Sequence, residues 1–431
     1  MREPRNTQNT RKNGEVESGG VWSGGVDFNA EAQRRRDEWF GDVPEKWVVK
    51  RLASYFSERK VKVSDKVFSP LSVTKNGILP QLENVAKSDD GDNRKLVRKG
   101  DFVINSRSDR KGSSGVSNYD GSVSLINLVL QPRGDLFGSY CNYLLKSLSF
   151  VEENYRNGRG IVADLWTTRY DEMKMIKVAM PSLSEQKAIV KYLDAETGRI
   201  DKAIAAEEKM IALLQERREI VINEAVSGSG KCGSEGIDFN AEAQRRRGWE
   251  VRKAKYLWQQ ITTPSLSSNK IGLENIEGST GRFVESVAQF EGDGIEFKKG
   301  DILYGKLRPY LAKVWVASCS GNAVGDFFVY RLESCIDSRF IQYYLLSSEF
   351  TEMATASTFG AKMPRVSAGF MANALIPLPP LSEQEEIVKY LDAETGKIDR
   401  AIEVKRRQIE LLRERRQIVI DEAVTGKVKV A

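Results

Sequence analysis

Two stretches of the chain carry the same long apolar pattern. Aliphatic residues recur at spacings of 4, 7, 4, 7, 3, 7 and 4 in both. The first set is Ile189, Leu193, Ile200, Ile204, Ile211, Leu214, Val221 and Ala225, and the second is Ile387, Leu391, Ile398, Ile402, Ile409, Leu412, Val419 and Ala423. A seam near 3.5 residues per turn is the a/d pattern of a coiled coil. We therefore predict two long helices, each with a seam that packs against a partner helix.

The two stretches are copies of one another. Residues 183–228 align with residues 381–426 without a gap, and 31 of the 46 positions are identical. Two like helices joined by a domain-sized insert can pair antiparallel, so their seams can serve as each other's partner. Each helix would be roughly 65 Å long at 1.5 Å per residue. A duplicated chain of this kind predicts internal pseudo-two-fold symmetry.

Local signals predict where these helices begin and end. Ser184 is expected to cap the first helix, and Ser382 with Glu385 to form a capping box in the second. Gly228 and Gly426 are expected to stop them. A further glycine lies inside each pattern, and an interior glycine costs about 1 kcal/mol relative to alanine. Breaks at Gly198 and Gly396 are therefore expected as an alternative to two continuous helices.

Short apolar runs separated by Gly, Asp and Asn turns precede each long helix. They predict two globular α/β domains, at residues 38–180 and 248–378, which we call the first head and the second head. Predicted strands include 102–104, 124–130, 302–304 and 326–330, and predicted helices are 140–148 and 338–346. The heads differ much more than the helices do, so the fold class is α+β: two different heads joined by two like helices, at 181–228 and 379–426.

The remaining segments are an N-terminal extension and a linker. Residues 1–37 are rich in Gly, Asn, Arg and Ser, which predicts disorder. Residues 229–247 are expected to be a linker. Each contains a copy of Phe-Asn-Ala-Glu-Ala-Gln-Arg-Arg-Arg, at 28–36 and 239–247. These twin elements are interpreted either as basic arms that contact phosphates or, preferably, as a duplicated linker with solvated arginines.

Composition narrows the chemistry. The chain has no histidine, which removes the commonest general base and the commonest zinc ligand. Four cysteines without CxxC spacing indicate a reduced, cytoplasmic protein with no metal site. No apolar run is long enough to span a bilayer, and no secretory signal is visible. The Gly-Ser-Gly-Lys at 228–231 lacks the first glycine and the Ser/Thr of a phosphate loop.

Charge is distributed unevenly along the chain. The net charge is +6, and each helical repeat carries −2, so the rest of the chain carries +10. A basic excess outside the two helices suits a polyanionic partner. A moderately basic surface without such a partner is the plainer interpretation of charge alone.

The motifs around the helices resemble a known family. Pro-Leu-Ser-Glu-Gln followed by Ile-Val-Lys-Tyr-Leu-Asp, and later Leu-Leu-Arg-Glu-Arg-Arg at 411–416, is typical of specificity (S) subunits of type I restriction-modification systems. The segments 300–311 and 38–47 also resemble parts of that family. The resemblance covers residues 38–426, whereas the N-terminal extension and the twin elements lie outside it.

The resemblance implies a function for each part. Each head would be a target-recognition domain that reads one half of a split sequence in double-stranded DNA. The helix pair would set the unread spacer and dock the methyltransferase (modification) subunits, two in number. Restriction subunits, with helicase and nuclease activities, would join through the complex. The S subunit would have no catalytic site and no cofactor of its own.

DNA binding needs Lys and Arg for phosphates, and Arg, Asn, Gln or Ser for base edges. Two loops in each head offer such residues next to strands or glycines. The candidates are Asn105, Arg107, Arg110, Lys111, Arg156 and Arg159 in the first head, and Lys306, Arg308, Lys362 and Arg365 in the second. Each of these cations is otherwise a solvated surface residue.

Two other functions stay open at this stage. One is the DNA-reading subunit of a system that only methylates. The other is a scaffold with two protein-binding heads on a coiled coil. The scaffold explains the helices, but it leaves the charge of the heads and the family motifs unexplained.

Overall fold

The computed structural model describes residues 38–81, 91–160, 166–227, 231–232, 237–238, 249–265, 267–286, 290, 292–358 and 362–430. The chain divides into two compact units. Unit 1 comprises Met1–Arg199 and Glu414–Ala431, and unit 2 comprises Ile200–Arg413. The predicted disorder of residues 1–37 lies outside the described residues. So do both twin elements, and a short strand at Ile237–Asp238 comes just before the second one.

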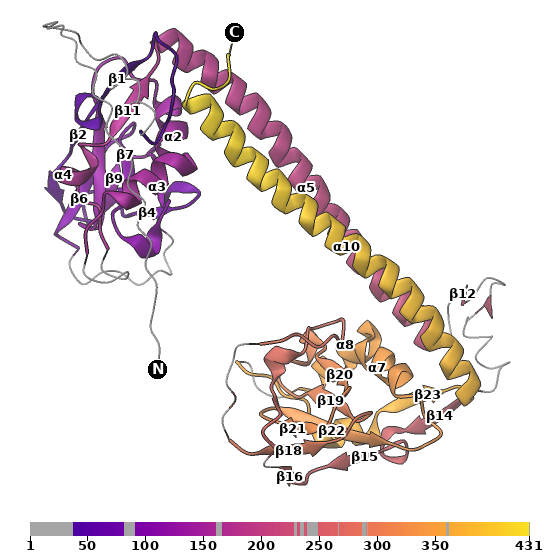
Figure 1. Ribbon diagram of the computed structural model, residues 1–431. Helices are drawn as coiled ribbons and strands as arrows, with labels where there is room; N and C mark the ends of the chain where they lie inside the picture. The colour runs from indigo at the N-terminus through magenta and orange to yellow at the C-terminus, as the bar shows by residue number, and fades with distance from the viewer. Residues whose placement is uncertain are drawn as a thin grey trace, which may run out of the picture. The chain divides into compact units, whose positions relative to one another are not determined.

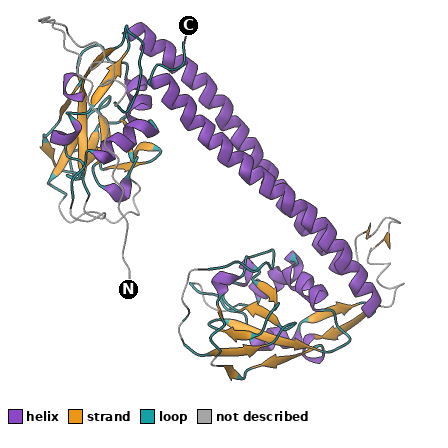
Figure 2. Cartoon of the chain, in the orientation of Figure 1, coloured by secondary structure: helices purple, strands orange, loops and turns teal. Residues whose placement is uncertain are grey.

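The first head combines strands and helices (Figures 1 and 2). It is built around a four-stranded antiparallel sheet in the order β2-β10-β7-β8. These strands are β2 (Phe56–Glu58), β10 (Asn127–Pro132), β7 (Phe102–Asn105) and β8 (Ser114–Val116). A three-stranded sheet is formed by β3 (Lys62–Val63), β6 (Arg94–Val97) and β9 (Gly121–Val123), and a hairpin by β4 (Leu71–Thr74) and β5 (Gly77–Pro80). The helices are α2 (Gly138–Lys146), α3 (Leu148–Arg156) and the short α4 (Tyr170–Met173).

Side chains along the central strands point alternately to the two faces of the sheet, and each face has its own apolar cluster. On β7, Phe102 and Ile104 are buried in the core that includes α2 and α3, whereas Val103 is buried in a second cluster with Leu71 and Ile78 of the hairpin. Successive side chains of a strand point to opposite faces, so a continuous apolar run is needed when both faces are covered. The strand predicted at 102–104 is confirmed in β7, and that predicted at 124–130 is confirmed from Asn127 only, since β10 begins there.

The second head repeats the same central sheet. The order is β15-β22-β19-β20, made of β15 (Trp258–Ile261), β22 (Phe327–Leu332), β19 (Ile302–Gly305) and β20 (Val314–Val316). Its second sheet has the order β16-β18-β21-β17, from Pro264–Ser265, Gly294–Phe297, Gly321–Ala323 and Lys270–Ile271. The helices are α7 (Ser338–Leu346), α8 (Ser348–Ala356) and α9 (Ala368–Asn373). The predicted strands at 302–304 and 326–330 and the predicted helix at 338–346 are confirmed in β19, β22 and α7.

Each head joins its long helix through a two-stranded ribbon. In unit 1 the ribbon pairs β1 (Val48–Arg51) with β11 (Lys177–Met180), which leads into α5 (Leu183–Ser227). In unit 2 it pairs β14 (Glu250–Lys253) with β23 (Leu375–Leu378), which leads into α10 (Leu381–Val424). Both helices are continuous, so the expected breaks at Gly198 and Gly396 do not occur. Burial of the turns around each glycine offsets the local cost, since Leu193, Ile200 and Leu391 are all buried.

The helices pack against each other within each unit, and they run antiparallel there. In unit 2, Arg218 of α5 lies 3.2 Å from Asp399 of α10, whereas the earlier Glu207 of α5 pairs with the later Lys405 of α10 at 3.0 Å. In unit 1, the core cluster takes Ile189, Val190 and Leu193 from α5. The same cluster takes Val419, Ile420, Ala423 and Val424 from α10.

The predicted seam residues lie on the inner side of this packing. Buried members are Ile189, Leu193, Ile200, Val221, Ala225, Ile387, Leu391, Ile402, Ile409, Val419 and Ala423, and half-buried members are Ile204, Ile211, Leu214, Ile398 and Leu412. Heptad spacing thus locates a continuous apolar stripe on each helix, as expected for helices underwound to 3.5 residues per turn.

The predicted N-caps are wrong. The first helix begins at Leu183, so Ser184 lies inside it, and the hydroxyl of Ser182 accepts the amide of Glu185 at 3.4 Å. The second begins at Leu381, and the carbonyl of Pro380 accepts the amide of Glu383 at 2.9 Å, so Ser382 and Glu385 form no capping box. The prediction at Gly426 is confirmed, because this residue follows the end of α10 with φ of +76°. Gly228 lies outside the described residues.

A glutamine at the start of each long helix fastens the adjoining head. Gln186 and Gln384 are both only 1% exposed. The Gln186 side chain accepts from the amide of Phe137 at 2.9 Å and donates to the carbonyl of Pro181 at 3.0 Å. Gln384 makes the same pair of bonds, with Asp337 at 2.9 Å and Pro379 at 2.8 Å. The repeated Ser-Glu-Gln sequence is therefore explained by a tertiary contact.

Two further contacts recur in both units. The indole of Trp47 donates to Glu185 at 3.0 Å, and that of Trp249 donates to Glu383 at 3.1 Å. Further along each long helix, an aspartate accepts a hydrogen bond from a tyrosine of the head. These pairs are Tyr143 with Asp194 at 2.7 Å and Tyr343 with Asp392 at 2.6 Å. We call each set of Trp–Glu, Gln and Tyr–Asp contacts a socket.

The far end of the opposite helix caps a head helix in each unit. In unit 1, Asp421 of α10 accepts the amide of Ser149 at the start of α3, at 3.2 Å. In unit 2, Asn223 of α5 accepts the amide of Ser348 at the start of α8, at 2.9 Å. Asn223 and Asp421 are the same position in the two repeats. Each head is therefore held by both long helices.

Candidate nucleic-acid interface

The loop after β7 in the first head is shaped by its own polar side chains. Asn105 ends the strand, and its side-chain oxygen accepts the amide of Arg107 at 3.0 Å. A short 3-10 turn follows at Ser108–Arg110. This local bond is the Asx-type turn that asparagine favours. Asn105 is half-buried, and Arg107 and Arg110 are exposed beyond it.

The structure brings the two predicted loops of the first head together. Thr167 forms isolated bridges with both Arg107 and Arg159. The amide of Thr168 also donates to the carbonyl of Ser106 at 3.0 Å. Segments some fifty residues apart in sequence thus share one edge, and Arg107 and Arg159 are carried by neighbouring backbones.

Most cations at this edge have acidic neighbours. Lys111 pairs with Glu152 at 2.7 Å and Arg159 with Glu172 at 3.4 Å. Within α3, Arg156 pairs with Glu153 at 3.0 Å, and Arg110 lies 3.6 Å from Asp109. Solvent-exposed pairs of this kind contribute about 0–1 kcal/mol. A phosphate can therefore replace such a carboxylate at little cost.

A basic hollow beside Arg107 was missed from the sequence. It has a volume of about 600 Å³. Its charged lining residues are Lys60, Lys62, Lys95, Arg107 and Arg169, together with Glu58 and Asp171. Lys95 pairs with Glu58 at 3.0 Å, and the exposed Lys60 pairs with the same carboxylate at 3.4 Å. Lys62 is exposed as well. The available signal was the Lys-Val-Lys of residues 60–62, which puts two cations close together at the start of β3.

The second head brings its predicted residues together in the same way. Leu307 forms an isolated bridge with Arg365, and the amide of Arg308 donates to the carbonyl of Pro364 at 2.9 Å. The amide of Val366 donates to the carbonyl of Lys306 at 3.1 Å. The loop after β19 and the segment before α9 therefore lie side by side, as the loop after β7 and the segment before α4 do in the first head.

The four candidates of the second head differ in accessibility. Lys306 is half-buried, with its ammonium 4.7 Å from the centre of the Phe328 ring. Burial lowers its pKa, with a further lowering from Arg365 and an opposing effect from Asp326. Arg308 and Lys362 are exposed. Arg365 is exposed and paired with Asp326 at 2.9 Å, a contact that raises its pKa.

Arg308 is held in an unusual backbone conformation. Its φ is +51°, in the left-handed region that non-glycine residues seldom adopt. Such residues persist only where the surroundings fix them, and they cluster at functional sites. The bond from Arg308 to Pro364 is one of these constraints.

The described residues contain no group of three or more His, Cys, Asp or Glu placed to hold a metal ion. Within the same residues, no helix has the length and apolar character that crossing a bilayer requires.

Part of the chain matches a known protein family. Residues 254–412 match the family model of the "Type I restriction modification DNA specificity domain". This match covers the second head and most of α10.

Two characterised relatives carry the corresponding name. The specificity subunit of the type I restriction enzyme EcoDI from Escherichia coli is 28% identical over 269 residues, which is 56% of this chain and 60% of that protein. The specificity subunit of the type I restriction enzyme MjaVIII from Methanocaldococcus jannaschii is 24% identical over 277 residues, 59% of this chain and 63% of that protein. The alignments thus span less than two thirds of these relatives.

The fold has a solved counterpart. A chain from a structural study of assembly and conformational transition in a type I R-M system aligns with 90% of this chain and all of its own length, with a TM-score of 0.66 and 17% identity. At this identity the match supports the fold alone. The sequence matches confirm the family resemblance: residues 254–412 match the specificity-domain model, and both relatives are specificity subunits of type I restriction enzymes.

Proposed function

We propose that the chain reads a bipartite, asymmetric sequence in double-stranded DNA, one half-site per head. The observation that carries this proposal is the edge shared by two loops in each head. In the first head it presents Arg107 and Arg159, and in the second Arg308, Lys362 and Arg365. One scaffold with two sets of side chains suits two different half-sites.

The flanking cations support contact with the DNA backbone. Lys60 and Lys62 line the hollow beside Arg107, where they can neutralise phosphates while the loop approaches base edges. Binding is then expected to weaken steeply with salt, because each neutralised phosphate releases counterions. Asn105, Arg110, Lys111, Arg156 and Lys306 remain candidates that lie within or beside the same edges.

We infer that the helix pair sets the unread spacer. Support comes from the length of the two helices, 45 and 44 residues without a break. Equal sheet order and equal sockets in the two units support an internal pseudo-two-fold arrangement. Such an arrangement suits two half-sites on opposite strands.

Exposed apolar residues on the helices support docking of methyltransferase subunits. Leu213 and Leu411 occupy the same repeat position and are 49% and 48% exposed. Ile220 and Ile418, seven residues later, are also exposed. A second apolar stripe outside the seam is typical of a helix that packs against another partner. Its presence in both repeats suggests two methyltransferase subunits, with restriction subunits joining through the complex.

The chain itself would contribute recognition and assembly, with no catalytic step and no cofactor. A methylation-only system remains the alternative, because that distinction lies in the partner subunits. The genes beside this one decide it: an amino-methyltransferase gene with a helicase-nuclease gene indicates a full type I system. A scaffold without DNA is the less favoured option.

The decisive experiment is binding-site selection from a random duplex library, using the full chain co-expressed with a type I methyltransferase subunit. Two unlike half-sites at a fixed spacing are expected. A perfect palindrome, or no enriched duplex, would contradict the proposal. Exchange of residues 38–180 for the first head of a relative should change one half-site only.

A further inference from the structure

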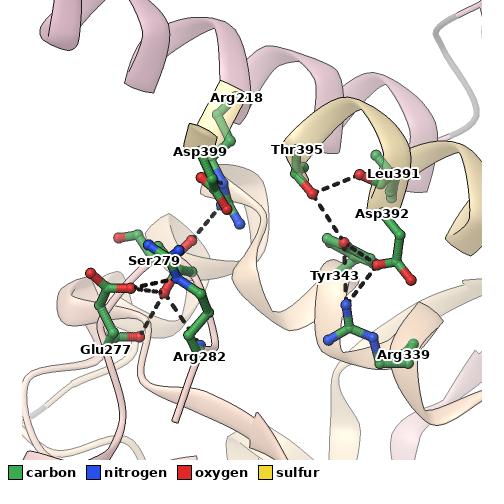
Figure 3. Close-up of polar contacts among 11 residues, drawn as sticks. Arg218, Glu277, Ser279, Arg282, Arg339, Tyr343, Leu391, Asp392, Thr395 and Asp399 are labelled. Atoms are coloured by element: carbon green, nitrogen blue, oxygen red, sulfur yellow. Dashed lines mark hydrogen bonds and ion pairs between the residues drawn. The ribbon is translucent and has the colours of Figure 1, made fainter. Parts of the chain in front are cut away.

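One arginine of α5 is buried where the long helices meet the second head. Arg218 is 7% exposed, and it lines a cleft of about 380 Å³ in unit 2. Its Nη1 donates to the carbonyl of Ser279 at 2.6 Å, and its Nε lies 3.2 Å from the carboxylate of Asp399 on α10 (Figure 3). This guanidinium of α5 therefore contacts both α10 and the second head.

The turn that receives Arg218 is closed by its own bonds. Thr280 and Arg282 both donate to one carboxylate oxygen of Glu277, at 2.7 and 2.9 Å. Figure 3 shows Arg282 beside Glu277. The amide of Glu277 donates to the carbonyl of Arg282 at 2.9 Å. Gln342 of α7 donates to the carbonyl of Gly281 at 3.0 Å. Ser279 is thus a fixed point on the head rather than the tip of a free loop.

This turn is packed directly against the loop that carries Arg308. The amide of Ser279 donates to the carbonyl of Ala312 at 3.1 Å. A side chain at Gly278 would overlap the carbonyl of Leu311, so the two backbones are in close contact. Arg218 is therefore two hydrogen bonds from the end of the Arg308 loop.

Strain is concentrated at the same place. Among the described residues, three that are not glycine have positive φ: Ser279 at +60°, Arg308 at +51° and Ala312 at +43°. Such conformations persist only when neighbouring contacts over-determine them. All three lie in the turn and the loop that Arg218 braces.

We propose that Arg218 is a positioning residue for half-site reading by the second head. By holding Ser279, it fixes the Arg308 loop relative to α5 and α10. The inference rests on the proposed function. It is specific to the second half-site, because the contacts of Arg218 lie in unit 2.

The test separates positioning from ion pairing. Arg218→Lys keeps a charge for Asp399, but a lysine lacks the guanidinium fork that reaches Asp399 and Ser279 together. Asp399→Asn removes the ion pair and leaves the bond to Ser279. Arg217→Met, on the adjacent exposed arginine, is the matched control. Each full chain, co-expressed with a methyltransferase subunit, is titrated with the selected duplex and with duplexes altered in one half-site.

For Arg218→Lys, we expect discrimination at the second half-site to fall about tenfold, the scale of one good base contact. Discrimination at the first half-site should be unchanged, and Asp399→Asn and Arg217→Met should behave as wild type. Equal losses at both half-sites, no loss in Arg218→Lys, or the same loss in Asp399→Asn would overturn the inference. A wild-type chain that selects no bipartite duplex would instead refute the proposed function.

Discussion

The buried glutamine of each socket provides the sharpest test of how the heads are held. Replacement of Gln384 by Leu removes the acceptor for the amide of Asp337 and the donor for the carbonyl of Pro379. A buried backbone group left without a partner costs about 1–3 kcal/mol. Neighbouring losses are not strictly additive, so we expect Gln384→Leu to destabilise unit 2 by about 2–5 kcal/mol.

Gln384→Glu is nearly isosteric and tests the direction of the hydrogen bonds. The carboxylate can still accept from Asp337, but it places negative charge against the carbonyl of Pro379. The folded-state pKa of the new carboxyl should therefore rise above its ordinary value of about 4.3. A raised carboxyl pKa means that the penalty is present above the unfolded pKa and disappears at lower pH, where the protonated acid can donate.

Hydrogen exchange of peptides covering residues 333–346 and 375–391 measures these effects locally, which avoids assuming a two-state transition for a chain with two units. Gln408→Leu, at an exposed position of α10, is the control. Gln186→Leu should give the matching loss in unit 1. Wild-type exchange in Gln384→Leu, or a Gln384→Glu penalty that is the same at pH 4 and pH 7, would refute the reasoning.

Three further predictions concern other contacts. Asp421→Asn should stabilise unit 1 at neutral pH, since burial raises the pKa of this carboxyl and Asn223 already makes the same cap. The gain in stability should grow as pH rises above about 4. A lower stability of the variant in urea unfolding at pH 7 would contradict this prediction. Gly426→Ala should lower the stability of unit 1 by about 1–2 kcal/mol or more, the cost of a side chain in the left-handed region, because φ is +76° and a Cβ would overlap Pro44. An unchanged unfolding midpoint would argue against this. Leu411→Lys should weaken co-purification with a methyltransferase subunit without altering the chain's thermal stability, and retained co-purification would exclude this stripe as the docking surface.

The helices and central strands were predictable because their signals are local. Heptad spacing alone indicated both long helices, and short apolar runs marked β7, β19 and β22. The caps were not predictable in the same way. Ser184 and Ser382 fit the local rule for a cap, but the helices begin earlier, where Gln186 and Gln384 are fixed by bonds to distant backbone.

Individual residues of the candidate site were predictable, but the contacts that bring their loops together were not. Loop composition pointed to Arg107 and Arg308, whereas the bridges that join their loops to residues near 167 and 365 are long-range contacts. The basic hollow was missed because Lys62 lies on a two-residue strand that composition does not mark, and Lys60 lies just before it. The burial of Lys306 follows from the Phe328 ring on a neighbouring strand.

The sockets have a consequence for how such a gene can change. The long-helix residues of the first socket lie within or just before a stretch of ten consecutive residues, from Ile189 to Gly198, that is identical in the second copy. A recombination crossover within this stretch would replace the head encoded before it. The aspartate of the long helix that binds the head's tyrosine would stay in place. New combinations of heads can therefore arise by single genetic events, each already matched to the helix that must hold it.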